Sequence, residues 1–134
     1  MSVFTKIITG EITSYKVAEN DEFIAFLDIN PNAKGHTLCV PKQEINKIFE
    51  MDKDLYGRLM SFSYDVAQAI EKAVPCKRVG VAVVGLEVPH AHIHLIPIQK
   101  ESDMLFSNPK LQLSSEEFVA IAKAINEAWE SNQK

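Results

Sequence analysis

The sequence predicts an α+β protein with an antiparallel sheet, and three features lead to this class. Short strand-like segments occur both before and after one long amphipathic segment, and a second amphipathic segment lies near the C-terminus. Strands that are grouped in this way, rather than alternating with helices, favour antiparallel pairing. With 134 residues, the chain has the length of one domain. We therefore expect about five strands and two substantial helices in a single domain over residues 1–134.

The N-terminal part predicts a short helix followed by three strands. Gly10 ends the helix, and Asn20 and Asp21 provide the turn chemistry of a hairpin. The segment DINPNAKG has the composition of a loop. The predicted elements are a helical turn over 4–8, strands over 15–19, 23–27 and 36–40, and the loop over 28–35.

The C-terminal part predicts two helices that surround two further strands. Apolar residues recur at steps of three and four after Asp52 and build one face of a long helix that Pro75 ends. The run from Arg78 to Val84 is almost continuously β-branched, which predicts a strand buried on both faces. Ser114 and Glu117 form a capping box before the last helix. The remaining predictions are a short helix over 44–50 and a strand over 91–96.

Composition excludes several classes of function. Net charge is −4 and no run of lysines or arginines occurs, so we expect no binding to duplex nucleic acid or to an anionic membrane. Small phosphate ligands stay compatible with this charge. Cys39 and Cys76 lie in unrelated contexts, and the N-terminus has no signal-peptide pattern. These features predict a reduced, cytoplasmic protein.

The most informative motif is the row of histidines at His90, His92 and His94. It contains three of the four histidines of the chain and alternates with apolar residues, which is the period of a strand. On one strand the three rings project from one face, about 6–7 Å apart. Imidazole titrates near neutral pH, and it can attack phosphorus or donate to phosphoryl oxygens. The same row is also compatible with a zinc site.

The motif HAHIHLI resembles the His-φ-His-φ-His-φ-φ signature of the histidine triad family, where φ is apolar. The order and spacing of several other segments are similar to the Hint-like branch of that family. The resemblance covers about residues 3–100. The matching residues are Phe4, Lys6-Ile7-Ile8, Gly10-Glu11-Ile12, Ala25 to Ile29, Pro31, Gly35-His36, Pro41-Lys42, Gly85 and Glu87-Val88-Pro89.

The resemblance implies a fold, an assembly and an activity. The fold is a five-stranded antiparallel sheet with one long central helix and a C-terminal helix. Two subunits join their sheets into one ten-stranded sheet, which makes a homodimer. Family members release a nucleoside 5′-monophosphate, AMP or GMP, from phosphoramidates, acyl adenylates or dinucleoside polyphosphates through a nucleotidyl-histidine.

The resemblance also implies roles for individual residues. His92 resembles the nucleophile, His94 the donor to the phosphate and proton carrier, and His90 a structural partner, while His36 is similar to a fourth family histidine. Asp28 resembles the carboxylate that accepts the ribose hydroxyls. The predicted base slot and loop contacts are Phe4, Ile7, Phe26, Leu27, Ile29, Gly85 and Glu87.

The sequence departs from the family pattern at two places. Many relatives hold structural zinc with a cysteine pair, and Ser2 and Thr5 stand at those positions, so we expect neither a metal nor another cofactor. An Asn-rich loop before the triad is replaced by residues 78–85, and Leu86 and Glu87 follow it. A carboxylate facing a phosphate is repulsive. The alternatives to a hydrolase are therefore a purine-nucleotide-binding module with little turnover and a histidine-based metal-binding protein.

Overall fold

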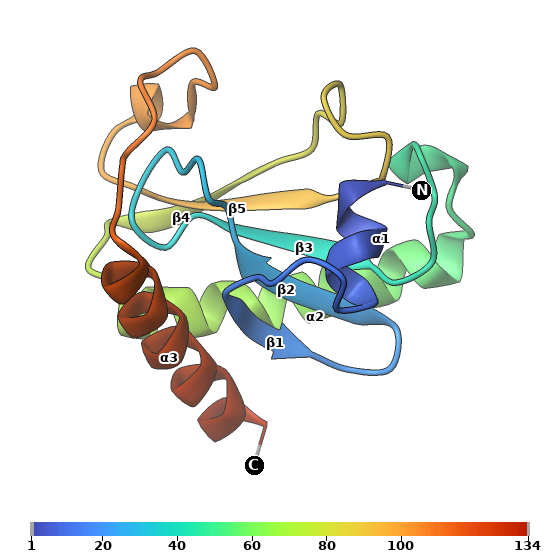
Figure 1. Ribbon diagram of the computed structural model, residues 1–134, viewed down its shortest axis with the longest axis horizontal. Coiled ribbons are helices and arrows are strands. Elements are labelled where there is room, and N and C mark those ends of the chain that lie inside the picture. Colours follow the sequence, from blue (N-terminus) through green and yellow to red (C-terminus); the bar gives the residue numbers. More distant parts are fainter. Residues whose placement is uncertain (1, 134) are drawn as a thin grey trace.

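The five strands form one antiparallel sheet in the order β1-β2-β3-β5-β4 (Figure 1). The computed structural model describes residues 2–133. Its elements are α1 (Val3–Ile8), β1 (Lys16–Glu19), β2 (Phe23–Leu27), β3 (Thr37–Pro41), η1 (Ile48–Glu50), α2 (Lys53–Ala73), β4 (Arg78–Ala82), β5 (Ile93–Ile98), η2 (Glu101–Met104) and α3 (Ser115–Asn132). The predicted class, a five-stranded sheet with a long helix and a C-terminal helix, is confirmed.

The two long helices begin at the predicted caps. The Asp52 carboxylate accepts hydrogen bonds from the N–H groups of Asp54 and Leu55 at the start of α2. At the start of α3, Ser114 and Glu117 exchange the two bonds of a capping box. Both helices therefore satisfy N–H groups that have no partner inside the helix.

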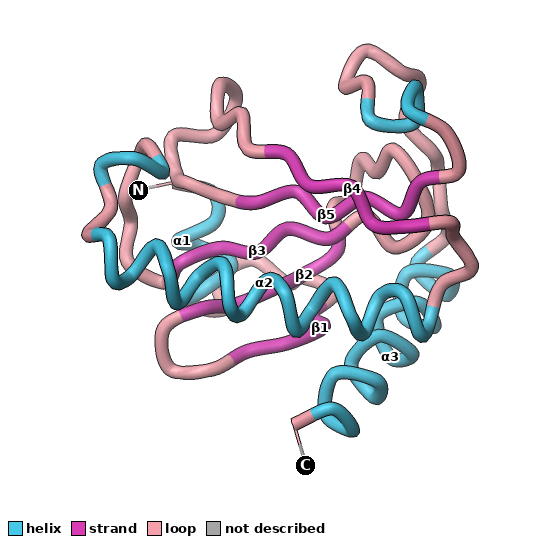
Figure 2. Tube along the Cα trace, turned by 180° about the vertical axis from the view of Figure 1, so that it is seen from behind, coloured by secondary structure: helices cyan, strands magenta, loops and turns pink. Residues whose placement is uncertain are grey.

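Helices cover the two faces of the sheet unequally. Figure 2 shows α2 lying across one face with α3 beside it, whereas the short α1 lies on the other face in Figure 1. Along β2, Phe23, Ala25 and Leu27 join the large cluster under α2 and α3, and Ile24 and Phe26 join a small cluster under α1. This small cluster consists of Phe4, Ile24, Phe26, Leu38 and Val40. Since α1 has only six residues, this face keeps room for a ligand.

Three predicted elements differ from the structure. β5 begins at Ile93 rather than at residue 91, because the N–H of Ala91 bonds the Ile45 carbonyl instead of β3. The predicted helix over 44–50 shrinks to the single turn η1. The prediction that Arg78–Val84 is buried on both faces is wrong for the single chain: β4 ends at Ala82 and is an edge strand, with Val81 54% exposed. Within residues 2–133, no helix has the length and apolar character needed to cross a membrane.

Gly35 ends the loop that leads into β3, and its conformation requires glycine. Its φ is +91°, and an added Cβ meets Val74 Cγ2 at 3.0 Å and Pro97 Cγ at 3.2 Å. Gly57 is exposed inside α2, where an added Cβ has no neighbour within 4 Å. We expect Gly35→Ala to lower the free energy of unfolding by about 1–3 kcal/mol and Gly57→Ala to raise it by about 0.5–1 kcal/mol. Urea denaturation measures both, and equal stability of Gly35→Ala and wild type contradicts the prediction.

Candidate active site

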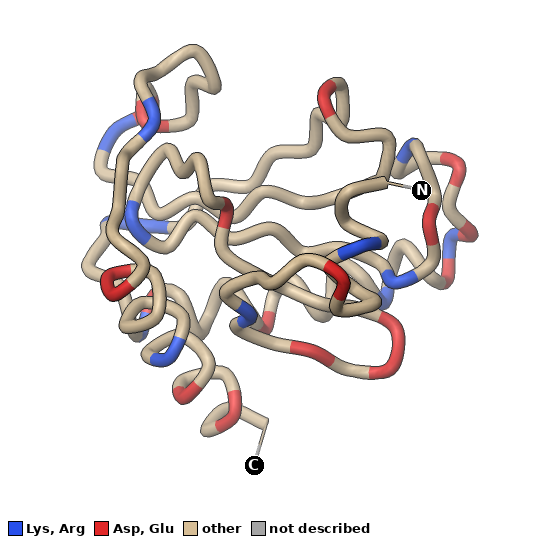
Figure 3. Tube along the Cα trace, viewed as in Figure 1, with Lys and Arg blue, Asp and Glu red and all other residues tan. Residues whose placement is uncertain are grey.

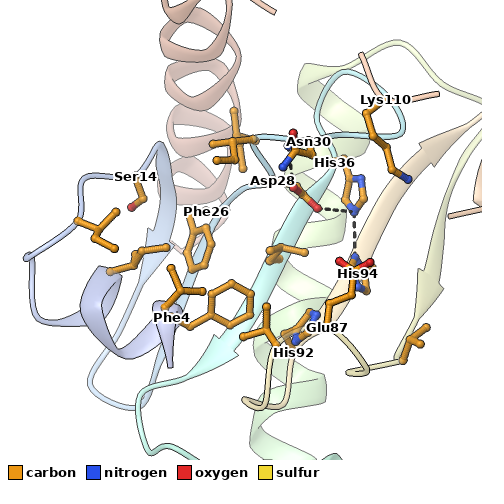
Figure 4. A pocket seen from close by; sticks show the side chains of 18 of the residues that line it. Phe4, Ser14, Phe26, Asp28, Asn30, His36, Glu87, His92, His94 and Lys110 are labelled. Atoms are coloured by element: carbon orange, nitrogen blue, oxygen red, sulfur yellow. Dashed lines mark hydrogen bonds and ion pairs between the residues drawn. The ribbon is translucent and has the colours of Figure 1, made fainter. Parts of the chain in front are cut away.

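A cavity of about 540 Å³ opens on the face of the sheet that carries α1 (Figure 4). One end is apolar and the other end is polar. The apolar end includes Val3, Phe4, Ile7, Ile12, Phe26 and Leu38, and the polar end includes Asp28, Asn30, His36, Glu87, His92, His94 and Lys110. The cavity therefore offers an apolar slot that continues into a row of polar side chains.

The structure brings most of the residues singled out from the sequence to this cavity. Those that line it are Phe4, Ile7, Phe26, Leu27, Asp28, Ile29, His36, Glu87, His92 and His94. Leu27 lies along the wall, but its side chain belongs to the cluster under α2, on the opposite face from Phe26. His90 and Gly85 are not among the lining residues, although Gly85 has the positive φ of +74° expected of a turn.

His90 is completely buried behind the cavity, and both of its ring nitrogens have partners. Nε2 donates to the Pro41 carbonyl at 2.8 Å, which leaves Nδ1 to accept from the Ser2 hydroxyl at 2.7 Å. Ser2 and Thr5 are held in turn by Glu44, whose carboxylate accepts from the Ser2 N–H and the Thr5 hydroxyl. These two bonds lower the pKa of Glu44 to about 2.

The same residues do not fit a structural zinc site. Ser2 and Thr5 present hydroxyls rather than thiolates, and the Ser2 hydroxyl and His90 Nδ1 already bond each other. Elsewhere in the described chain, the one group with three ligand-type side chains is Asp28, His36 and His94, whose atoms lie within 4.8 Å of one another. A metal at that place has to displace the hydrogen bond between the two histidines.

His92 presents one free nitrogen to the cavity. Its Nδ1 lies 2.7 Å from the carbonyl oxygen of His90, and because a carbonyl only accepts, Nδ1 carries the proton. Nε2 of the neutral ring therefore holds a lone pair. The Phe4 ring packs edge-on against the imidazole at 5.0 Å between centroids and limits its rotation. A fixed ring with a basic Nε2 is the form that a nucleophilic histidine needs.

His94 has the opposite tautomer, and a chain of hydrogen bonds sets it. The backbone N–H of Asn32 donates to Nδ1 of His36 at 3.0 Å, so His36 carries its proton on Nε2. That Nε2 donates to Nδ1 of His94 at 3.0 Å, and His94 consequently carries its proton on Nε2. The ring centroids of His92 and His94 are 4.8 Å apart. The cavity therefore presents a lone pair on one ring beside an N–H donor on the next.

Burial keeps these rings neutral. Desolvation is the largest cause that lowers the pKa of His36 to about 3 and of His94 to about 4, and it also lowers the pKa of His92. Burial raises the pKa of Asp28, whose carboxylate accepts from the Asn30 N–H at 2.9 Å. Asp28 lies 3.7 Å from His36 Nε2, a contact between a carboxylate and a neutral imidazole rather than an ion pair.

Sequence reasoning missed several residues of the site, and four of them bear on the histidines or on the charge of the cavity. Ser2 was considered only as the replacement of a thiol, and Asn32 only as part of a loop. Phe106 and Lys110 lie beyond the stretch that resembles the family, yet both line the cavity, and the Phe106 ring rests on His94 at 4.7 Å. No local pattern in the sequence marks these four residues, because tertiary contacts alone bring them to the histidines.

The arrangement matches a known family. The sequence profile of the HIT domain, which is the histidine triad domain, matches residues 9–101. The chain belongs to the HIT family. It is 34% identical over 132 residues to an uncharacterized HIT-like protein of Borreliella burgdorferi. The aligned region covers 92% of this chain and 95% of that protein.

Other HIT proteins extend the comparison. An adenosine 5′-monophosphoramidase of Schizosaccharomyces pombe is 32% identical over 127 residues, covering 92% of this chain and 95% of the relative. Among solved structures, a Hit-like protein of Bartonella henselae superposes with a TM-score of 0.84 at 30% identity over 95% of each chain. The family resemblance expected from the sequence is therefore confirmed. As a HIT protein, the chain belongs to a family that binds nucleotides or nucleotide conjugates and includes hydrolases.

The lowered histidine pKa values predict a loss of stability in mild acid. Between pH 6.5 and about 4, unfolded histidines bind protons while the folded rings stay neutral, so stability falls as pH falls. Each such group contributes a slope of at most about 1.4 kcal/mol per pH unit. We expect a shallower slope between pH 6.5 and 5 for His36→Gln than for wild type in urea denaturation. Parallel slopes contradict the prediction.

Proposed function

We propose that the protein hydrolyses conjugates of a nucleoside 5′-monophosphate, AMP or GMP, including phosphoramidates, through a nucleotidyl-histidine at His92. The observation that carries this proposal is the tautomer pair in the cavity. His92 offers a lone pair on Nε2, and His94 offers an N–H on Nε2 from the neighbouring ring. One group attacks phosphorus while the other donates to the phosphoryl oxygen on which charge accumulates.

The shape of the cavity supports a nucleotide as the ligand. A purine suits the apolar slot, where the Phe4 and Phe26 rings meet edge-on at 5.5 Å. The ribose then lies at Asp28, because one carboxylate oxygen is used by Asn30 and the other is free to accept from hydroxyls. The phosphate reaches His92 and His94, which follow Asp28 along the cavity in Figure 4.

The proposed reaction has two steps. Nε2 of His92 forms a bond to phosphorus as the P–N bond of a phosphoramidate breaks, and the departing amine takes up a proton from a water molecule in the open cavity. The hydroxide that remains then attacks the same phosphorus, breaks its bond to His92, releases the nucleoside monophosphate and returns the lone pair to Nε2. His94 is neutral in the free site, and its Nε2–H donates to the phosphoryl oxygen while the bond to His92 forms.

The relatives agree with this chemistry. Two of them are adenosine 5′-monophosphoramidases, that of Schizosaccharomyces pombe and that of Saccharomyces cerevisiae, the latter 34% identical over 108 residues. The tautomers in the cavity support His92, rather than His94, as the ring that attacks phosphorus.

A nucleotide-binding module with little turnover is the second candidate, and Glu87 favours it. This carboxylate lines the cavity and is drawn beside His94 in Figure 4. Negative charge at that position repels an anionic phosphate and slows the attack of His92. A module of this kind binds nucleotides with the same residues but does not complete the reaction.

Replacing His92 distinguishes the hydrolase from the nucleotide-binding module. We expect His92→Ala to reduce steady release of the amine from a fluorogenic adenosine 5′-phosphoramidate by at least about 1,000-fold, because no other ring offers a free Nε2 lone pair. Acid quench of a reaction with radiolabelled nucleotide measures covalent labelling, which we expect for wild type and not for the variant.

Two controls make the result decisive. Thermal unfolding and binding of AMP show whether His92→Ala keeps its fold and its nucleotide slot. Wild type that binds AMP but is neither labelled nor active supports the binding module instead. Turnover by His92→Ala at the wild-type rate rules out His92 as the nucleophile.

We further propose a homodimer that pairs two β4 edges. Among residues 2–133, β4 has no neighbouring strand on one side, and Val81, Val83 and Val84 are 54%, 42% and 51% exposed. An unpaired apolar edge is a template for another strand.

A purine nucleotide or nucleotidyl conjugate is the proposed ligand. The cytoplasmic location expected from the sequence stays a prediction.

Sedimentation tests the dimer. We expect wild type at micromolar concentration to sediment at about twice the chain mass of 15.0 kDa and Val81→Lys to sediment as a monomer, because a charge on the edge disfavours pairing. Val119→Lys on α3, where Val119 is 56% exposed, is the matched control and keeps the mass of wild type. A monomeric wild type contradicts the proposal.

A further inference from the structure

The segment after β5 turns back toward the cavity and supplies part of its wall. In Figure 1 this segment, coloured orange, rises beyond the ends of β4 and β5 before it reaches α3. Phe106 and Lys110 of this segment line the cavity. The Phe106 ring lies 4.7 Å from the His94 ring and 6.5 Å from the His36 ring, so the segment packs directly on the histidines.

Asn32 fixes this segment in place. Its side-chain amide donates to the carbonyls of Asp103 and Leu105, at 3.1 Å each, and this orients its oxygen toward Lys110. The Lys110 ammonium donates to that oxygen and, at 2.8 Å, to the Phe106 carbonyl. The backbone N–H of the same Asn32 sets the tautomers of His36 and His94. The position of the ammonium is therefore tied to the histidine chain.

Two of the three N–H groups of Lys110 are used in this way, which leaves one donor. None of the ion pairs between the described residues includes Lys110. The side chain is half-buried, and its ammonium lies 5.4 Å from the centroid of the Phe106 ring. A cation held by neutral partners at the wall of a cavity keeps its charge available for an anion.

Lys110 is also the one lysine or arginine among the lining residues. Figure 3 shows the other basic residues spread over several elements. The histidines are neutral, and Asp28 and Glu87 add negative charge. Among the described residues that line the cavity, Lys110 is therefore the only full positive charge that a ligand meets.

The position of Lys110 indicates which part of a bound substrate lies near its ammonium group. In Figure 4 the rings of Phe4 and Phe26 lie at one end of the cavity, and Lys110 lies at the other end, beyond Asp28 and above His94. With the base in the apolar slot and the scissile phosphorus at His92, the group bonded to phosphorus on the far side points toward Lys110.

We propose that Lys110 binds an anionic group on the leaving side of the substrate, so that the preferred conjugates carry a carboxylate or phosphate next to the scissile bond. This inference rests on the proposed function, because the leaving side is defined by attack from His92. Lys110 acts as a specificity-determining residue, and Asn32 and Phe106 position it.

Three matched phosphoramidates of AMP test the inference. Their amines are glycine, aminomethylphosphonate and glycinamide, which present a carboxylate, a phosphonate and a neutral amide at the same distance from one P–N bond. We expect wild type to prefer the two anionic conjugates in kcat/KM by about tenfold over the neutral one. The larger of the two preferences identifies carboxylate or phosphate as the favoured anion.

Variants at Lys110 separate its charge from its packing. Lys110→Met keeps the apolar stem, and we expect it to abolish the preference, so that the three conjugates react with similar kcat/KM. Lys110→Arg restores most of the preference. Lys123→Met removes an exposed lysine on α3 and leaves the preference unchanged. Higher salt weakens the preference of wild type, since it screens the charge.

The outcomes for Lys110 and for the proposed function are distinct. An equal loss of rate with all three conjugates in Lys110→Met overturns the inference, because Lys110 then binds the phosphate that they share. An unchanged preference overturns it as well. If no conjugate turns over, displacement of a fluorescent AMP analogue still measures the three affinities. A preference in affinity that Lys110→Met removes then supports the anion site while the hydrolase proposal fails.

Discussion

Backbone groups of two loops decide which nitrogen of each histidine carries a proton, and the chemistry of the site depends on this constraint. The Asn32 N–H directs the proton to Nε2 in His36 and, through it, in His94. The carbonyl of His90 directs the proton to Nδ1 in His92. Adjacent rings of identical composition thus become an acceptor and a donor without any difference in charge. A backbone partner cannot titrate, so the assignment persists as long as these loops keep their conformation.

The helices and most strands could be predicted because their signals are local. The apolar period of α2, the caps at Asp52 and Ser114, and the turn at Asn20 are contained in short stretches of sequence. The neighbours of a strand are not encoded locally. The run after Arg78 has the composition of a central strand yet lies at an edge, and the strand predicted from residue 91 begins at Ile93 because Ala91 bonds the loop at Ile45.

The candidate site also has features that are local in the sequence and features that depend on tertiary contacts. The alternation of His90, His92 and His94 indicates which residues share a face, and that part could be predicted from the sequence. The two nitrogens of an imidazole cannot be distinguished in a sequence, because the partner of each lies elsewhere in the chain. Lys110 lines the cavity because of the path of the segment after β5, and Asn32 matters through contacts to His36 and to that segment, which its neighbours in sequence do not predict.

The exposed edge of β4 has a consequence for the handling of the protein. Val81 lies on a strand whose outer N–H and C=O groups have no neighbour in the described chain, and Leu86 in the loop that follows is 89% exposed. Such an edge accepts any extended segment, including one from a partly unfolded copy. Dilution and mild acid, which weaken association and native stability, both favour this mispairing. In the isolated chain, mispairing is therefore expected at β4 rather than in the core that α2 covers.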